Sequence, residues 1–260
     1  AKPLILVTND DGINAPGIRT LINVMKDVGD IIVVAPDSPQ SGMGHAITIN
    51  STLHSSRISP NESEFLEYSC SGTPADCVKL AINELMPRKP DLCVSGINHG
   101  SNSSINVIYS GTMSAAIEAG IEGVPAIGFS LLDYRWNANF NESKDFIKKI
   151  TENALKNGIP NGVVLNVNIP SVKKSEIKGI AALGHISLKI IHRYPSPLTF
   201  AASTKSITII SIPKALESLK TTGEKIAPAV IIKIGIDDPT AATTTKPNII
   251  VGIASKILKN

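Results

Sequence analysis

The sequence lacks any long apolar segment: nowhere do its 260 residues approach the roughly 18 uninterrupted apolar residues that a membrane-spanning helix needs. The basic, apolar and cleavage regions of a signal peptide are also missing, because a strand-like run begins at Leu4. Cysteine is scarce, and Cys70, Cys77 and Cys93 show no CxxC spacing, which argues against a disulfide framework or a zinc site. We therefore expect a cytoplasmic protein with no membrane partner and with reduced thiols in its interior.

Several catalytic motifs are missing as well. There is no GxxxxGK[ST] loop for ATP, no GxGxxG after the first strand for a dinucleotide, and no GxSxG for a serine nucleophile. An aspartyl-phosphate mechanism needs an Asp near the first strand, which Asp10 supplies. That class of phosphatase has a DxDx[TV] pattern, whereas here Asp10 and Asp11 are adjacent and Gly12 follows. The adjacent pair fits metal binding better.

The net charge of +3 hides an uneven distribution. Residues 1–170 carry 12 Lys and Arg against 17 Asp and Glu, a net charge of −5, and residues 171–260 carry 13 against 5, a net charge of +8. A basic segment can contact nucleic acid, but these lysines are scattered and only Tyr194 and Phe200 are aromatic. We expect a solvated basic surface and no specific nucleic acid partner.

Short β-branched runs alternate with helical patterns over the first 170 residues. This alternation predicts right-handed βαβ crossovers and a doubly wound, mostly parallel sheet covered by helices on both faces, the three-layer αβα class. We expect strands at 4–8, 31–35, 91–95, 126–129 and 163–167, helices at 17–28, 74–86, 112–120 and 142–156, and an extended excursion at 46–68.

The regular spacing ends near Pro170. Beyond it we expect strands at 207–212 and 230–236 and a helix at 213–220. We therefore divide the chain into an α/β catalytic core, residues 1–170, and a basic C-terminal extension, residues 171–260.

Four polar, glycine-rich loops follow predicted strands, and ligands bind beyond the carboxyl ends of the strands in an open parallel sheet. The loops are TNDDGINAPG, APDSPQSGMGH, SGINHGSNSS and YSGTMSAA; the last runs into a helix, so its backbone N–H groups and the helix dipole face the loop. Two carboxylates, a serine hydroxyl and an asparagine carbonyl form an oxygen-only ligand set, which favours Mg²⁺ or Mn²⁺ over zinc.

Each of these features has a simpler explanation when taken alone. An Asp-Asp-Gly at a strand end is commonly a turn, and SGT before a helix is commonly an N-cap. His45 by itself is more typical of a surface or hydrogen-bonded core histidine. Several such loops on one predicted edge are harder to explain by structure alone, so we favour a functional site.

Four stretches, ILVTNDDGINAPGI, VVAPDSPQSGMGHAIT, CSGTPADCVKLA and SGINHGSN…YSGTMSAAIEAG, carry a family likeness in their order and spacing. They resemble the survival protein E (SurE) family of divalent-metal-dependent nucleoside-monophosphate phosphatases. The likeness runs from about residue 4 to LNVNIP at 165–170. It implies a Rossmann-like α/β core, a C-terminal extension used in forming a homodimer or homotetramer, a cytoplasmic location, and release of phosphate from 5′- and 3′-nucleotides, with short polyphosphate as a further substrate of some members.

The resemblance also implies a ligand set. Asp10 and Asp11 match the family's paired metal-ligand aspartates, Ser41 its ligand serine and Asn98 its ligand asparagine, which together would hold one Mg²⁺ or Mn²⁺ per subunit. We expect Asp10 and Asp11 to be catalytic as well, and leave open whether Asp10 is the general base. The expected phosphate-binding and substrate-binding residues are Asn98, Asn102, Ser110, Gly111 and Thr112.

The C-terminal region departs from the family pattern. Relatives continue through EIKGI into an Arg- and aromatic-rich stretch, whereas here AALGHISLKIIHRYPSPLTF follows. Sequence divergence and a change of reading frame both account for this difference, and both put the oligomer contacts in question more than the metal site. The alternative function is therefore a nucleotide- and metal-binding protein without turnover, whose altered C-terminal region prevents a competent assembly.

Overall fold

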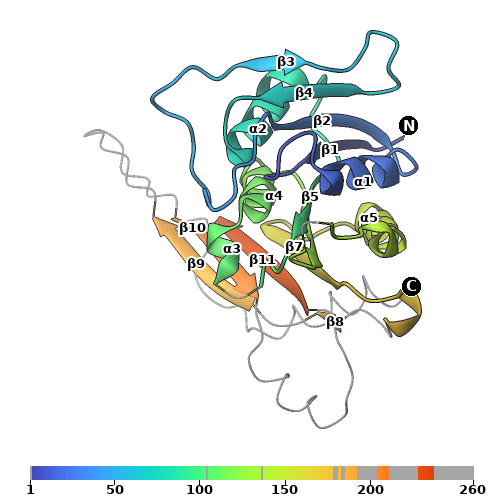
Figure 1. The fold of residues 1–260 in the computed structure, drawn as a ribbon. Coiled ribbons are helices and arrows are strands. Elements are labelled where there is room, and N and C mark those ends of the chain that lie inside the picture. Colours follow the sequence, from blue (N-terminus) through green and yellow to red (C-terminus); the bar gives the residue numbers. More distant parts are fainter. Residues whose placement is uncertain are drawn as a thin grey trace.

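The computed structural model describes residues 2–103, 105–135 and 137–177, and beyond them the strand segments 181–182, 185–191, 204–210 and 228–236. Six parallel strands form the centre of one sheet (Figure 1), in the order β4-β2-β1-β5-β6-β7. Their bounds are β1 Leu4–Thr8, β2 Asp30–Pro36, β4 Leu66–Cys70, β5 Leu92–His99, β6 Ala126–Leu132 and β7 Val163–Pro170.

Antiparallel strands extend the sheet at both ends. β3 (Ser55–Arg57) pairs with β4 at one end. At the other end β11 (Pro228–Ile236) pairs with β7, and β10 (Thr204–Ile210) and β9 (His185–Ile191) follow in turn. The short strand β8 (Ala181–Ala182) pairs in parallel with β11.

Helices cover both faces of the parallel strands. α1 (Pro16–Met25) and α5 (Lys144–Asn157) contact each other on one face. On the other face α4 (Gly111–Ile121) contacts α2 (Pro74–Leu80), which continues as a π-helical turn, Ala81–Leu85. A short helix α3 (Asn106–Tyr109) precedes α4, and single 3₁₀ turns span Asn141–Ser143 and Lys174–Glu176. The three-layer α/β prediction is confirmed.

Strand β1 illustrates why the central strands are apolar throughout. Successive side chains of a strand point to opposite faces. Ile5 and Val7 pack in the core on the α1 and α5 side, whereas Leu4 and Leu6 pack in the core on the α2 and α4 side. Because both faces are covered by helices, every residue of β1 is buried.

The direction of winding reverses between β1 and β5. From β1 the chain moves outward to β2 and β4, and then crosses to β5, from which it continues to β6 and β7 on the other side. A ligand site is expected beyond the carboxyl ends of the strands at such a switch point. Asp10 and Asp11 follow β1 directly, and Asn98 lies near the carboxyl end of β5.

The structure confirms the predicted order of core elements and corrects several bounds. The helix predicted at 17–28 ends at Met25, and only residues 74–80 of the helix predicted at 74–86 are α-helical. The extended excursion contains β3 and β4, and β4 also joins the parallel sheet beside β2, which was not predicted. The strands predicted at 207–212 and 230–236 correspond to β10 and β11.

Three further predictions concern the C-terminal region, the domain boundary and the cysteines. The helix predicted at 213–220 lies outside the described residues. The division at residue 170 coincides with the end of β7, and its meaning as a domain boundary stays a prediction. Cys70, Cys77 and Cys93 are buried, free thiols as predicted, and no helix within the described ranges is long and apolar enough to cross a membrane.

Candidate metal centre

Asp10 lies at the centre of the candidate site. Only 4% of its surface is exposed, and its Oδ1 accepts a hydrogen bond from the Thr112 hydroxyl at 2.5 Å. Gly111 packs against the same carboxylate so closely that a Cβ atom at this position would lie 2.5 Å from Asp10 Cβ and 2.8 Å from Oδ2. The loop after β1 and the amino terminus of α4 therefore meet at Asp10.

The paired carboxylates have little charge compensation. Burial raises the pKa of Asp10 to about 6, and the neighbouring charge of Asp11 adds to this rise, while the Thr112 hydrogen bond opposes it. Burial also raises the pKa of Asp11, against an opposing hydrogen bond from the backbone of His99. No Lys, Arg or His side chain among the described residues forms an ion pair with either aspartate. A bound cation would supply the missing charge.

The Ser41 loop is joined to Asp10 by the backbone. The N–H of Gln40 donates to the carbonyl of Asp10 at 2.7 Å, and the N–H of Ile13 donates to the carbonyl of Pro36 at 2.8 Å. Ser41 itself is exposed. The predicted ligand serine thus lies one residue beyond a direct contact with the predicted ligand aspartate.

Asn98 lies on a strand and not in a loop, which corrects the prediction that the strand ends at residue 95. β5 continues to His99 because a register shift between Ser95 and Asn98 restores its pairing with β6, where Asn98 lies opposite Ser130. Such irregularities redirect side chains near active sites. The Asn98 Nδ2 donates to the Gly100 carbonyl at 3.4 Å and to Asn102 Oδ1 at 3.3 Å. These two bonds orient the Asn98 amide and do not use its Oδ1.

Asn102 is buried within a network of polar side chains. Its Nδ2 donates to the Ser130 hydroxyl at 2.8 Å, and its backbone N–H donates to Asn168 Oδ1 at 2.9 Å. The amide of Asn166 donates to the Asn102 carbonyl at 2.6 Å. Asn102 is thus held firmly, and its side chain contacts Asn98, the predicted ligand.

The predicted phosphate-binding segment forms the first turn of α4. Ser110 is the N-cap, and its hydroxyl accepts a hydrogen bond from the N–H of Met113 at 3.0 Å. The hydroxyl of Thr112 is committed to Asp10. The segment is therefore an ordinary cap, as its sequence also suggested, and in addition it directs the positive end of the α4 dipole toward Asp10.

The donor set fits a hard divalent cation. Two carboxylates, a hydroxyl and an amide carbonyl offer oxygen only, which suits Mg²⁺ or Mn²⁺. Among the described residues, no three or more His, Cys, Asp or Glu side chains are grouped so that they could hold a metal ion by themselves, so a zinc-type cluster is not seen in that part of the chain. Three buried side-chain oxygens close in sequence to Asp10 or Asn98 have no hydrogen-bond partner within the described ranges. They are Thr8 Oγ1, Asn9 Oδ1 and Ser95 Oγ. The interior at the ends of β1 and β5 is therefore polar and incompletely paired.

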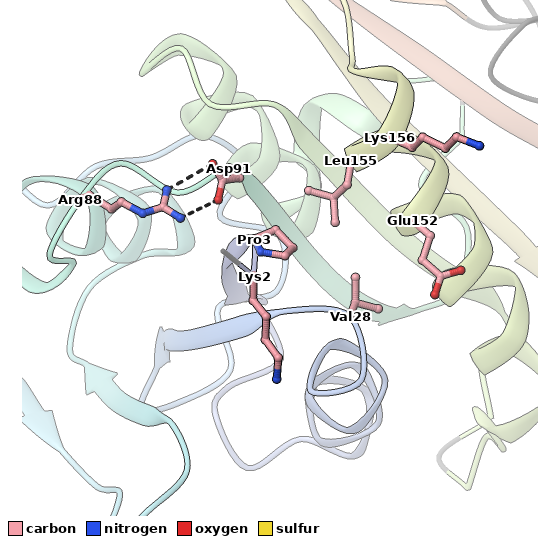
Figure 2. A pocket seen from close by; sticks show the side chains of 8 residues that line it. All are labelled: Lys2, Pro3, Val28, Arg88, Asp91, Glu152, Leu155 and Lys156. Atoms are coloured by element: carbon pink, nitrogen blue, oxygen red, sulfur yellow. Dashed lines mark hydrogen bonds and ion pairs between the residues drawn. The ribbon is translucent and has the colours of Figure 1, made fainter.

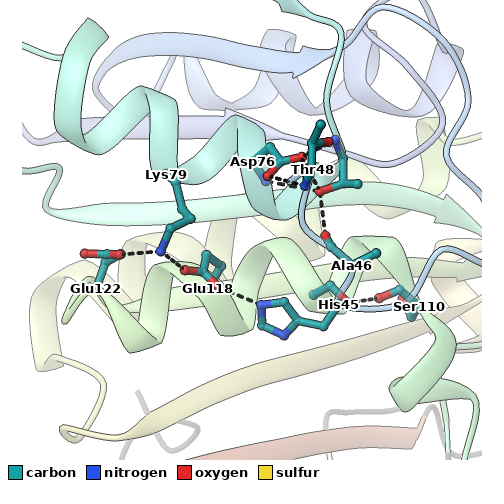
Figure 3. Close-up of polar contacts among 10 residues, drawn as sticks. His45, Ala46, Thr48, Asp76, Lys79, Ser110, Glu118 and Glu122 are labelled. Carbon is teal, nitrogen blue, oxygen red and sulfur yellow. Dashed lines mark hydrogen bonds and ion pairs between the residues drawn. The ribbon is translucent and has the colours of Figure 1, made fainter. Parts of the chain in front are cut away.

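Three contacts of this region are not predicted from the sequence. His45 Nε2 lies 2.6 Å from Glu118 Oε2, and Lys79 Nζ lies 2.7 Å from Glu118 Oε1 (Figure 3). Arg19 donates to the carbonyl of Ile13, which fixes the loop that carries Asp10 and Asp11. The partners of Glu118 lie 73 and 39 positions away in the chain, so these two contacts leave no local sequence signal.

An open hollow of about 550 Å³ lies at the amino ends of the central strands, away from the candidate site (Figure 2). Lys2, Pro3 and Asp91 line it at the amino ends of β1 and β5. The Arg88 guanidinium pairs with Asp91 at 2.8 Å, so the charges there largely cancel. It shares no residue with the carboxylate site, and we assign it no function.

Comparison with known sequences gives a consistent result. The sequence model of the family described as "Survival protein SurE" matches residues 5–190. A protein of Christiangramia forsetii named "5'-nucleotidase SurE" is 75% identical over 180 residues, which cover 69% of each chain. A protein of Cytophaga hutchinsonii with the same name is 62% identical over 183 residues, which cover 69% of this chain and 70% of that one.

Comparison with solved structures agrees. The crystal structure of the SurE protein from Aquifex aeolicus is 32% identical and superimposes with a TM-score of 0.67. The alignment covers 99% of this chain and all of the other. The chain belongs to the survival protein SurE family.

Proposed function

We propose that this protein is a divalent-metal-dependent 5′-nucleotidase, a phosphatase that hydrolyses nucleoside monophosphates to nucleoside and phosphate. Relatives that are 62–75% identical carry the name 5'-nucleotidase SurE. The structural observation that carries the proposal is the pair of buried Asp10 and half-buried Asp11, which forms no ion pair within the described residues and lies at the switch point of the sheet beside the amino terminus of α4. Nucleoside 3′-monophosphates and short polyphosphate are secondary substrates of the same proposal.

The metal would be held by Asp10, Asp11, Ser41 and Asn98, as one Mg²⁺ or Mn²⁺ per subunit. When bound, such an ion supplies positive charge that polarises a phosphoryl oxygen and lowers the pKa of a water molecule. Asp10 provides a buried carboxylate fixed by Thr112. The loop beginning at Gln40 brings Ser41 to the same side, and Asn102 orients the Asn98 amide.

The substrate phosphate would bind against the first turn of α4. Ser110, Gly111 and Thr112 begin this helix, and an anion at a helix amino terminus interacts favourably with its free N–H groups and with the dipole. The Thr112 hydroxyl already donates to Asp10, and the Ser110 N–H donates to the Val107 carbonyl. The Ser110 hydroxyl only accepts, from the Met113 N–H, so this hydroxyl and the Gly111 N–H carry the role. Asn102 helps to orient the substrate through Asn98. The same donors would stabilise the negative charge that grows in the transition state.

Location and assembly complete the proposal. We infer a cytoplasmic enzyme, which three free thiols in the interior support because disulfides are uncommon in a reducing compartment. We also infer a homodimer or homotetramer, as the family resemblance implies. Light scattering coupled to size exclusion measures the assembly directly, and a stable monomer would contradict this part.

Phosphate release from a panel of mononucleotides tests the activity. Purified protein with Mn²⁺ or Mg²⁺ should release phosphate from 5′-AMP, and EDTA or the substitution Asp10→Asn should abolish the release. Parallel assays with 3′-AMP and triphosphate rank the secondary substrates. Absence of metal-dependent release from every mononucleotide, together with measurable nucleotide binding, would favour the alternative of a binding protein without turnover.

A further inference from the structure

The loop that carries Ser41 needs support from outside itself. Residues 37–49 follow β2 and contain no helix or strand, and Ser41 is exposed, so burial does not fix its position. Gly42 and Gly44 have positive φ angles of 78° and 57°, which let the chain turn sharply just after Ser41. The position of Ser41 therefore depends on the contacts that hold the loop on either side.

These contacts lie one residue before Ser41 and four to five residues after it. The Gln40 N–H holds the loop to Asp10 on one side. On the other side His45 Nε2 reaches Glu118 at 2.6 Å, and the Ala46 carbonyl accepts a hydrogen bond from the Thr73 hydroxyl at 2.7 Å (Figure 3). His45 is the first side chain after Ser41 that joins the loop to α4.

Helix α4 contributes to the candidate site at its other end. Its first turn contacts Asp10 through Thr112, and Glu118 lies six residues further along. At 1.5 Å per residue this separation is about 9 Å of rigid helix. The His45–Glu118 contact thus fixes the Ser41 loop to the same rigid body that positions Asp10.

Glu118 does not depend on His45 for charge compensation. Only 7% of its side chain is exposed, and Lys79 Nζ lies 2.7 Å from its other carboxylate oxygen. Lys79 also pairs with Glu122 at 3.1 Å, which keeps the ammonium close (Figure 3). Replacing His45 therefore leaves the buried carboxylate paired, and we expect the fold to tolerate the change.

We propose that His45 is a positioning residue, whose hydrogen bond to Glu118 sets the place of Ser41 and thereby strengthens divalent-metal binding. This inference rests on the proposed function, because it requires that Ser41 and Asp10 share a metal. A partner that orients a ligand is typically worth about 10- to 100-fold in metal affinity or activity.

Mn²⁺ binding to the metal-free protein tests this role independently of turnover. The free Mn²⁺ signal in electron paramagnetic resonance gives the dissociation constant. His45→Ala should raise this constant about 10-fold. His45→Gln should raise it less, because its amide can still donate to Glu118. His54→Ala is the matched control, since His54 is exposed and, within the part of the chain that the structure describes, forms hydrogen bonds through its backbone alone; it should leave binding unchanged.

A double substitution tests whether His45 acts through Ser41. If it does, adding His45→Ala to Ser41→Ala should raise the dissociation constant by much less than 10-fold, because the two effects are coupled. The midpoint of thermal unfolding in EDTA should be close to that of the unsubstituted protein for His45→Ala. Unchanged Mn²⁺ binding by His45→Ala, full additivity with Ser41→Ala, or a large fall in the unfolding midpoint would each overturn the inference.

Asp10→Asn distinguishes this inference from the proposed function. Loss of Mn²⁺ binding in Asp10→Asn together with normal binding in His45→Ala would overturn the positioning role alone. Normal binding in Asp10→Asn would overturn the metal site, and with it both proposals.

Discussion

Asp10 is destabilising in the metal-free protein. Its carboxylate is almost fully buried beside Asp11, and among the described residues it has no cationic partner within ion-pair distance. The Thr112 hydrogen bond offsets only part of this cost, since the pKa of Asp10 remains raised. Active sites often retain such unfavourable groups because the ligand compensates them.

The first prediction concerns the pH dependence of stability in EDTA. The pKa of Asp10 rises from 3.8 to about 6 on folding, so the folded state binds more protons between these values. The free energy of unfolding should therefore fall as pH rises from about 3 to about 7, by up to about 3 kcal/mol in total. Urea unfolding at a series of pH values measures this slope.

Asp10→Asn supplies the control for this prediction. The neutral amide should flatten the slope and make the metal-free protein more stable than the unsubstituted one at neutral pH, while activity is lost. A less stable Asp10→Asn protein at neutral pH would show that the carboxylate is compensated by a partner we have not identified.

The second prediction concerns the hydroxyl of Thr112. Thr112→Val keeps the shape of the side chain but removes the donor to Asp10, which lies 2.5 Å away. Because this hydrogen bond lowers the pKa of Asp10, its loss should raise that pKa further and reduce kcat by about 10- to 100-fold. Thr112→Ser retains the hydroxyl and should keep most of the activity. Equal activity of the Val and Ser variants would contradict the role of the hydrogen bond.

At the scale of elements, buried amides join the segment after β5 to β7. Asn168 Oδ1 accepts from the Asn102 N–H at 2.9 Å, and its Nδ2 donates to Asn166 Oδ1 at 3.1 Å. This network holds the segment after Asn98 against the sheet. The residues that follow Asn98 are therefore supported by buried side chains of β7.

The third prediction follows from this network. Asn168→Ala leaves the buried Asn102 N–H and the Asn166 side-chain Oδ1 without these partners, and the free energy of unfolding should fall by about 2–4 kcal/mol. Chemical denaturation measures the loss. Asn153→Ala, on the exposed face of α5, is a suitable control and should change stability by less than about 0.5 kcal/mol. A loss below about 1 kcal/mol for Asn168→Ala would show that water replaces the amide.

Strands whose ends are marked by the local sequence are predicted well, and features that depend on pairing between strands are not. The strand at Leu4–Thr8 was predicted with its correct bounds, because its apolar run ends abruptly at polar residues. The extension of β5 to His99 was missed, because a register shift is decided by pairing with β6 and not by local composition. The parallel pairing of β4 with β2 was missed for the same reason.

The predictability of the site differed from residue to residue. Loop chemistry and family resemblance predict site roles for Asp10, Ser41, Asn98 and Thr112, and the structure brings Asp10 and Thr112 into direct contact. The link between His45 and Glu118 joins residues 73 positions apart, so nothing in the local sequence indicates it. Contacts of this kind become visible only when the sheet and its helices are assembled.

At the scale of the whole molecule, a metal that binds the folded state should stabilise it. The fourth prediction is that Mn²⁺ raises the midpoint of thermal unfolding, because metal binding to the native state shifts the folding equilibrium. At a free Mn²⁺ concentration about 100 times the dissociation constant, the expected stabilisation is about 2.7 kcal/mol. Differential scanning calorimetry measures the shift, which should be absent in Asp10→Asn. An equal shift in that variant would place the metal elsewhere.

The central claim is that Asp10, Asp11, Ser41 and Asn98 converge on one divalent cation. Anomalous diffraction from crystals soaked with Mn²⁺ tests it most directly. The account predicts one strong anomalous peak per subunit, within about 2.5 Å of oxygen atoms from these four side chains. A peak at other residues, or no peak at the ends of β1 and β5 in crystals of active protein, would contradict it.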